Sequence, residues 1–174
     1  MNLRVLEKED LPLLTEWMNN TKLWGEYFSP DQFSKAEMEK RFSEPSKFEA
    51  KWFMIEKKDG TKIGYMLHFY AFYGMAKTME IAYGLIPSER RKGYCSEAVR
   101  LMVDYLFLSK HVSCVQAITH INNVASQGVL KKVSFEKEGS MRKRAYIRGE
   151  WIDMVLFSIL RDEWKEPKIL TRTT

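Results

Sequence analysis

The segment MEIAYGLIPSERRKGYCSEAVRLMVDYLF, residues 79–107, constrains the fold more strongly than any other part of the chain. An apolar run typical of a strand ends at a proline, a basic turn containing Gly93 follows, and the sequence then becomes helical in its periodicity. A helix N-terminus already carries positive charge, so Arg90, Arg91 and Lys92 oppose the local field unless an anion binds there. The turn therefore predicts an anion-binding site, and a solvated basic turn is the alternative.

The composition fits one folded domain. A chain of 174 residues with 45% hydrophobic and 13% aromatic residues can bury a substantial core. We expect residues 1–166 to form a single domain and the polar residues 167–174 to form a frayed tail. The net charge of +5 is compatible with an anionic ligand or with transient contact to nucleic acid, but we expect no stable nucleic-acid complex.

Cysteine and histidine usage indicates neither a disulfide framework nor a metal site. The two cysteines, Cys95 and Cys114, form no CxxC pair, and the three histidines show no metal-ligand spacing. The first ten residues lack the apolar core of a signal peptide, and no stretch reaches the roughly 18 apolar residues of a membrane span. We therefore expect a cytoplasmic protein without membrane contact.

The N-terminal part of the chain alternates between strand and helix signals. Residues 2–6 have the alternation of a strand, and Asp10 is a candidate N-cap for the helix that follows it. Residues 19–30 form a loop that carries exposed-looking aromatic side chains. The tetrapeptide SKAE, residues 34–37, is a capping box that begins a second helix.

The remaining chain predicts a sheet with helical crossovers. Residues 51–70 read as two strands joined at Asp59-Gly60, which is a strong hairpin signal. A helix starts at residue 95 or 96 and ends near residue 110, and the strand after it follows a short turn, so parallel pairing is expected. A short helix over residues 124–133 and two long strands joined near Gly149 complete a mixed α+β arrangement.

Two motifs in this order resemble the GNAT superfamily of N-acetyltransferases. Its acetyl-CoA segment reads Arg/Gln-x-x-Gly-x-Gly/Ala, which matches Arg90 and Gly93, with Cys95 in place of the last small residue. The sequence HINNVASQGVLKKVSFEKEG resembles a second signature, Asn-x-x-Ser and then Gly-Phe, of the branch that acetylates ribosomal-protein N-termini (RimJ/RimL-like). Here Asn123 and Ser126 match, and Ser134 replaces the glycine.

The end of the chain, YIRGEWIDMVLFSILRDEW, is also similar to that branch, and the resemblance is weakest over residues 19–50. It implies a three-layer fold with a mostly antiparallel sheet of about seven strands and about four helices. It also implies that acetyl-CoA is the co-substrate and that no metal takes part. The residues that it assigns to acetyl-CoA are Leu85, Ile86, Arg90, Arg91, Lys92, Gly93, Tyr94, Cys95, Ser96, Asn123 and Ser126.

The reaction implied is direct attack of a primary amine on the thioester, without an acyl-enzyme. Glu80, on the strand that leads into the basic turn, is the candidate general base, and an edge carboxylate on a solvated face is the alternative. The helix after Asn123 lacks the tyrosine that many relatives use as proton donor, so Ser126 or solvent would protonate the thiolate. Helix capping is the alternative role for both Asn123 and Ser126.

Protonation energetics favour a protein N-terminal amine as acceptor. At pH 7, neutralising an α-ammonium costs about 1.4 kcal/mol, whereas a lysine or polyamine ammonium costs about 4.6 kcal/mol. We expect the acceptor groove to lie between residues 19–33 and the final hairpin, with Tyr83 beside the cofactor. The candidate contacts are Trp24, Tyr27, Phe28 and Tyr83. The alternative for the first three is that they line a small-molecule pocket or fill the core. The alternatives are a small-molecule amine as acceptor (an antibiotic, a polyamine or an amino sugar) and a non-catalytic CoA-binding module. We expect the protein to be a monomer or a homodimer.

Overall fold

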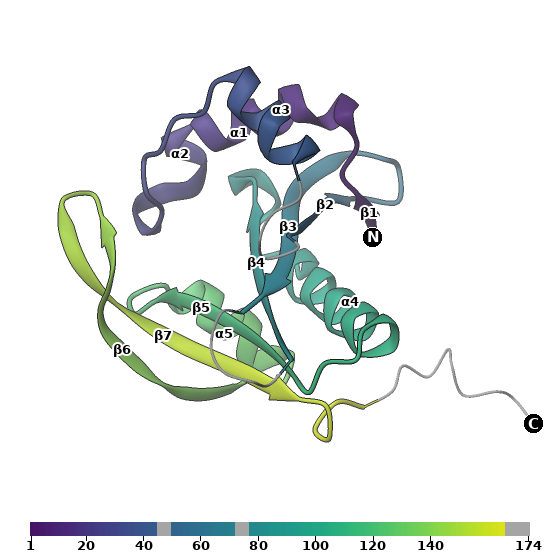
Figure 1. The fold of residues 1–174 in the computed structure, drawn as a ribbon, viewed down its shortest axis with the longest axis vertical. Helices are drawn as coiled ribbons and strands as arrows, with labels where there is room; N and C mark the ends of the chain where they lie inside the picture. The colour runs from purple at the N-terminus through teal and green to yellow at the C-terminus, as the bar shows by residue number, and fades with distance from the viewer. Residues whose placement is uncertain (45–49, 72–76, 166–174) are drawn as a thin grey trace, which may run out of the picture.

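The computed structural model describes residues 1–44, 50–71 and 77–165 and contains a seven-stranded sheet with the order β1-β2-β3-β4-β5-β7-β6 (Figure 1). The strands are β1 (Asn2–Val5), β2 (Lys51–Glu56), β3 (Lys62–Tyr70), β4 (Thr78–Leu85), β5 (Cys114–His120), β6 (Glu136–Ile147) and β7 (Glu150–Leu160). The helices are α1 (Leu11–Asn19), α2 (Thr21–Trp24), α3 (Lys35–Ser43), α4 (Tyr94–Ser109) and α5 (Val124–Lys132). Short 3-10 helices are η1 (Lys8–Asp10), η2 (Gly25–Tyr27) and η3 (Pro87–Glu89). The prediction of a mixed α+β sheet is confirmed; the predicted tail, residues 167–174, lies outside the described residues.

The sheet is antiparallel except where β4 and β5 pair in parallel. That parallel register covers three residues of each strand, from Thr78 opposite Cys114 to Glu80 opposite Gln116. Beyond Glu80 the two strands run apart, as Figure 1 shows. The predicted parallel pairing across a helix is therefore confirmed, and it ends in a splay between β4 and β5 at the middle of the sheet.

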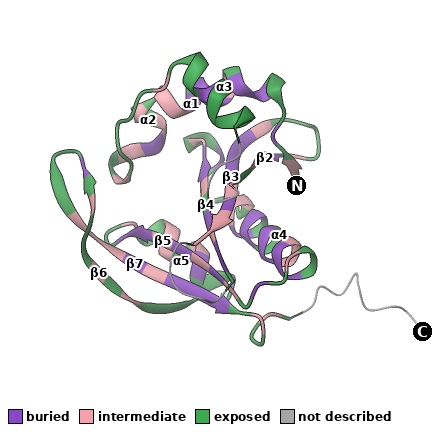
Figure 2. Ribbon diagram, in the orientation of Figure 1, coloured by how far each residue is buried: buried purple, intermediate pink, exposed green. Residues whose placement is uncertain are grey.

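Helices cover both faces of the sheet. The large core cluster joins α4 and α5 to one face and includes Met79 and Ile81 of β4. A second cluster joins α1 and α2 to the opposite face through Tyr65 and Met54. Met79 and Ile81 are buried in the α4 cluster, so Glu80 between them faces the other side of the sheet, because side chains alternate along a strand. Figure 2 shows the buried residues of α4 and of the strands beside it in purple.

Local signals place several elements where the sequence predicts them. Glu37 N–H donates to Ser34 Oγ at 3.2 Å, and Ser34 N–H donates to the Glu37 carboxylate at 2.7 Å, so the predicted capping box begins α3. The β2–β3 hairpin turns at Gly60, whose φ of +84° suits glycine.

Three N-terminal and C-terminal details differ from the predictions. Residues 21–27 are helical, in α2 and η2, and Trp24 is buried rather than exposed. Its ring lies against Gly84, where an added Cβ would be 2.5 Å from the indole, so a tertiary contact decides its burial. Strand β6 extends to Ile147, beyond the segment SFEKEGSM (residues 134–141) that has the pattern of a strand, because its pairing with β7 resumes at Ala145 after a break in register at residues 142–144.

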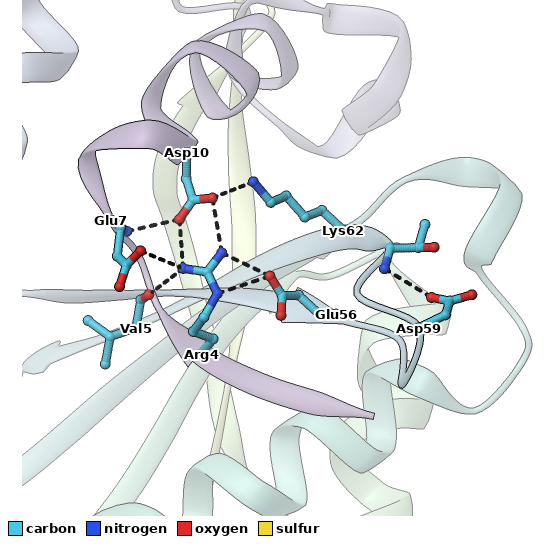
Figure 3. A network of polar contacts seen from close by, with 8 residues as sticks. Arg4, Val5, Glu7, Asp10, Glu56, Asp59 and Lys62 are labelled. Carbon is cyan, nitrogen blue, oxygen red and sulfur yellow. Dashed lines mark hydrogen bonds and ion pairs between the residues drawn. The ribbon is translucent and has the colours of Figure 1, made fainter.

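Asp10 occupies the N-cap position of α1, but its side chain makes no capping hydrogen bond. Its carboxylate instead accepts two hydrogen bonds from Arg4, both at 3.0 Å, and lies 2.6 Å from Lys62 Nζ (Figure 3). Arg4 also donates to Glu56 of β2 at 2.8 Å. This network connects β1, the first helical turn and the β2–β3 hairpin, so Asp10 serves tertiary structure rather than the capping of α1.

Candidate active site at the splay between β4 and β5

The turn before α4 is exposed over residues 90–93 and leads into the N-terminus of that helix. Arg91 and Gly93 both have positive φ, +62° and +86°, and Gly93 is the N-cap of α4. A Cβ at Gly93 would meet no atom within 4 Å, so glycine suits this position because of its backbone angle and not for lack of space. The first N–H groups of a helix have no partner within it, so this turn can bind an anion such as a phosphate.

The three basic residues of the turn lie in different surroundings. Arg90 donates from Nε to the Leu85 carbonyl at 3.0 Å and from Nη2 to the Leu23 carbonyl. It therefore ties the start of α4 to the end of β4 and to α2. Lys92 lies 3.2 Å from Glu89, and Arg91 is exposed, so Arg91 and Lys92 give the turn its outward positive charge.

Glu80 lies at the vertex of the splay, at the last pair before β4 and β5 separate. Its Oε2 accepts a hydrogen bond from Gln116 Nε2 at 2.8 Å. Burial raises the pKa of Glu80 above its ordinary value, and the Gln116 hydrogen bond partly offsets that rise. A half-buried carboxylate with a raised pKa can accept a proton from a substrate amine, which is the property required of a general base.

On the α4–α5 side of the sheet, Tyr83 reaches across the splay from β4 to α5. Its Oη lies 3.0 Å from Ser126 Oγ. Asn123 Oδ1 accepts the Ser126 backbone N–H at 3.0 Å and caps α5, as the capping alternative predicted for Asn123. The Ser126 hydroxyl is not part of that cap and is directed to Tyr83 instead.

The other residues predicted to contact acetyl-CoA lie at the end of β4 and at the start of α4. Burial raises the pKa of the half-buried Cys95 to about 12, so it is a thiol at neutral pH and a poor nucleophile. Leu85 and Ser96 are buried, and Ile86 and Tyr94 are partly buried, between the end of β4 and the first turn of α4.

A cavity of about 340 Å³ lies between η2 and the tip of the β6–β7 hairpin. Arg148 donates to the Gly25 carbonyl at 3.1 Å, and the Tyr27 and His120 rings are 4.9 Å apart. The cavity is lined by Glu26, Tyr27, His120, Asn122, Ile147, Arg148, Glu150 and Ile152.

Only some of the residues that line this cavity could be predicted from the sequence. Of the three candidate acceptor contacts in residues 19–33, Tyr27 lines the cavity, whereas Trp24 is in the core and Phe28 is exposed outside the lining. Sequence reasoning missed Glu26 and Glu150, which come from segments far apart in the chain and belong to no motif. No local signal marks them; their juxtaposition depends on where the hairpin folds back.

Within residues 1–44, 50–71 and 77–165, no group of three or more His, Cys, Asp and Glu side chains is placed to hold a metal ion. None of the helices in these ranges is both long and apolar enough to cross a membrane.

Comparison with known proteins identifies the family to which the chain is related. A family profile described as an acetyltransferase (GNAT) domain matches residues 1–136. The uncharacterised N-acetyltransferase YoaA of Bacillus subtilis is 32% identical over 107 residues, which are 62% of this chain and 60% of that protein. The chain spans about 60% of the length of YoaA and of two further Bacillus subtilis relatives, YnaD and YjcK.

Two solved structures share the fold at low sequence identity. Spermidine N-acetyltransferase from Vibrio cholerae, in complex with CoA and spermine, superposes with a TM-score of 0.80 at 20% identity and covers 93% of this chain and 96% of that one. Ribosomal-protein-S5-alanine acetyltransferase from Vibrio fischeri gives a TM-score of 0.76 at 22% identity, with 94% of each chain covered. On the family match to residues 1–136, this chain belongs to the acetyltransferase (GNAT) family.

Proposed function

We propose that this chain is an N-acetyltransferase that transfers the acetyl group of acetyl-CoA to a primary amine, with a protein or peptide N-terminus as the acceptor. One observation carries the proposal: β4 and β5 separate directly after the Glu80–Gln116 pair. The separation leaves a gap in the sheet with a carboxylate at its vertex and an anion-binding turn at the end of β4.

Acetyl-CoA binds with its pyrophosphate on the turn before α4. The N–H groups around Gly93 and the first turn of α4 donate to the phosphates, and Arg91 and Lys92 supply positive charge. The pantetheine arm lies along β4 toward Leu85 and Ile86 in the manner of an added strand, so the thioester reaches the splay. Asn123 acts here through the cap that holds the first turn of α5.

The reaction is a direct acyl transfer in a ternary complex. Glu80 accepts a proton from the substrate ammonium, and the neutral amine attacks the thioester carbonyl carbon to form the C–N bond. The C–S bond then breaks, its electron pair stays on sulfur, and Ser126 donates a hydrogen bond to that thiolate. The attacking nitrogen then loses its second proton, which leaves a neutral amide, and the thiolate takes up one proton to become free CoA. The first proton, on Glu80, returns to water.

The cavity between η2 and the hairpin supports a peptide acceptor. Its lining combines two carboxylates, Glu26 and Glu150, with the guanidinium of Arg148. A peptide N-terminus offers both a cation and carbonyl oxygens, and its α-ammonium is easier to neutralise than a side-chain ammonium. The structurally similar Vibrio fischeri protein is named as an acetyltransferase of ribosomal protein S5 alanine, which agrees with this choice.

A polyamine is the second candidate, because Glu26 and Glu150 line the same cavity. Because these two carboxylates belong to no sequence motif, the structure gives this alternative more weight than the sequence does. A spermidine N(1)-acetyltransferase of Escherichia coli is 20% identical over 94% of this chain, and the Vibrio cholerae neighbour was crystallised with spermine.

The two acceptor classes can be separated by thiol release from acetyl-CoA with Glu26→Gln and Glu150→Gln. A polyamine contacting both carboxylates should show a KM raised up to about fivefold by each change, since a single exposed ion pair contributes roughly 0.2–1 kcal/mol. For a peptide beginning with alanine or serine, whose single ammonium can contact only one of the two carboxylates, at least one of the two changes should alter KM less than twofold. Lys143→Gln, on β6 outside the cavity lining, is the control.

The outcomes decide between the three functions. Wild-type turnover with peptides and none with spermidine or spermine supports the N-terminal acceptor, and the reverse supports the polyamine. Acetyl-CoA binding without thiol release across peptides, polyamines and amino sugars would contradict catalysis and favour a CoA-binding module.

The phosphate-binding turn makes a separate prediction. Gly93→Ala should weaken acetyl-CoA binding about tenfold, because a side chain at φ +86° is strained by roughly 1–2 kcal/mol and the turn must shift to relieve it. Gly128→Ala is the matched control, since its Cβ also meets nothing within 4 Å but its φ is not positive. Isothermal titration with CoA measures both variants, and equal affinities would contradict a role for this turn.

A further inference from the structure

The hydrogen bond between Tyr83 and Ser126 is left unexplained by the family motifs. Tyr83 lies on β4 and Ser126 lies in the first turn of α5, on the opposite side of the splay, with 3.0 Å between their oxygens. The Tyr83 ring packs against the core cluster that joins β4 to α4, so its hydroxyl is held by a rigid support.

Each hydroxyl carries one hydrogen, which limits how the pair can act. When Ser126 directs its hydrogen to another acceptor, its oxygen is free to accept, and Tyr83 is the hydroxyl within reach. Burial, with a contribution from Cys95, raises the pKa of Tyr83 well above its ordinary value, so Tyr83 keeps its hydrogen throughout the neutral range. A donor that never ionises under working conditions can fix the direction of its partner.

We propose that Tyr83 is a positioning residue for acetyl transfer: it donates its hydroxyl hydrogen to Ser126 Oγ and thereby directs the Ser126 hydrogen toward the departing thiolate. The inference rests on the proposed function and extends it by one residue. No proton has to leave Tyr83. As the C–N bond forms and the C–S bond breaks, the negative charge on sulfur is stabilised by a hydroxyl dipole that is already oriented. Two hydrogen bonds in series strengthen each other in a site of low dielectric constant, so the Ser126 donor is stronger with Tyr83 behind it.

The proposal can be tested with variants that keep the packing. Tyr83→Phe retains the ring in the core and removes only the hydroxyl, and Ser126→Ala removes its partner. We expect Tyr83→Phe to lower kcat about tenfold, to leave the KM for acetyl-CoA within twofold, and to add nothing to the defect when combined with Ser126→Ala. Tyr70→Phe, which removes a hydroxyl from a side chain packed against the same core cluster, should have wild-type kinetics.

A second readout separates positioning from structure. An acetyl thioester of a nitrothiophenol has a far more acidic leaving thiol than CoA and needs less stabilisation of its thiolate. With this donor the Tyr83→Phe defect should shrink to less than threefold, whereas damage to the fold would lower the rate equally with both donors.

Four results define the outcome. Non-additive kcat losses that shrink with the acidic leaving group support the proposal. Wild-type kcat in Tyr83→Phe, or fully additive losses in the double variant, would overturn it while leaving the proposed function intact. Wild-type protein that releases no thiol with any amine would overturn the proposed function itself, and this inference with it.

Discussion

Replacing Asp10 with asparagine is expected to lower the free energy of unfolding by about 3 kcal/mol. Asp10 is 1% exposed, and its carboxylate accepts hydrogen bonds from Arg4 at 3.0 Å and from the Glu7 backbone at 2.9 Å, with Lys62 Nζ at 2.6 Å. Asparagine keeps the size of the side chain but removes the charge, which leaves two cations close together (Figure 3). Arg4 and Lys62 are each about one-third exposed, so solvent screens part of the loss and the lower end of the range for buried ion pairs applies.

The pH dependence of this stabilisation has a definite sign. Burial alone would raise the pKa of Asp10, but hydrogen bonds from Arg4 and Lys62 outweigh it and hold that pKa well below the ordinary value of 3.8. Between the lowered pKa of Asp10 in the folded protein and its ordinary value of 3.8, the unfolded chain binds more protons than the folded one. The stabilisation by Asp10 is therefore complete above about pH 3.8 and is lost as the pH falls further. Urea denaturation at pH 7 and pH 2.5 should therefore show a smaller difference between wild type and variant at the lower pH.

Glu7 provides the control for this prediction. Its carboxylate is 67% exposed and lies 3.8 Å from Arg4, so Glu7→Gln should change the free energy of unfolding by less than about 0.5 kcal/mol. A loss from Asp10→Asn no larger than that of Glu7→Gln would mean that the network contributes orientation but little stability.

The elements that the sequence predicts are those determined by neighbours in the chain. The capping box at Ser34 and the hairpin at Asp59-Gly60 depend on residues within four positions of each other, and both form as expected. The basic turn before α4 is likewise a local pattern, and Gly93 adopts the left-handed conformation that the turn requires.

Features that depend on distant segments could not be predicted in this way. Asp10 has the residue type and position of a helix cap, but Arg4 and Lys62 compete for its carboxylate once β1 and the β2–β3 hairpin meet. Trp24 has the sequence context of an exposed loop, yet Gly84 provides a surface without a side chain on which its ring is buried.

In the candidate site, too, local contacts could be predicted from the sequence and contacts between distant segments could not. Asn123 caps α5 through a contact three residues away, which the sequence supports as one of two roles. The hydrogen bond between Tyr83 and Ser126 joins residues 43 positions apart, and the vertex position of Glu80 depends on where the pairing of β4 with β5 ends. Neither the hydrogen bond nor the vertex position of Glu80 is marked in the sequence by a periodicity or a residue spacing.

Replacing Glu80 with glutamine is expected to lower kcat/KM for the amine about 100-fold, the lower end of the range for loss of a general base. Glutamine keeps the shape of the side chain but cannot accept the ammonium proton. Because burial raises the pKa of Glu80, the wild-type rate should rise with pH through a midpoint above 4.5, as the carboxylate loses its proton. Steady-state thiol release from pH 4.5 to 9 measures this acidic limb, and Glu80→Gln should lack it.

Gln116 offers a variant that changes the base without removing it. Its side-chain hydrogen bond lowers the pKa of Glu80, so Gln116→Met should move the acidic limb to higher pH while the rate at high pH stays near that of wild type. Unchanged rates and an unchanged pH profile in Glu80→Gln would mean that the amine arrives already neutral. Binding of the rare neutral amine would then replace general-base catalysis, and the splay would act by orienting the two substrates alone.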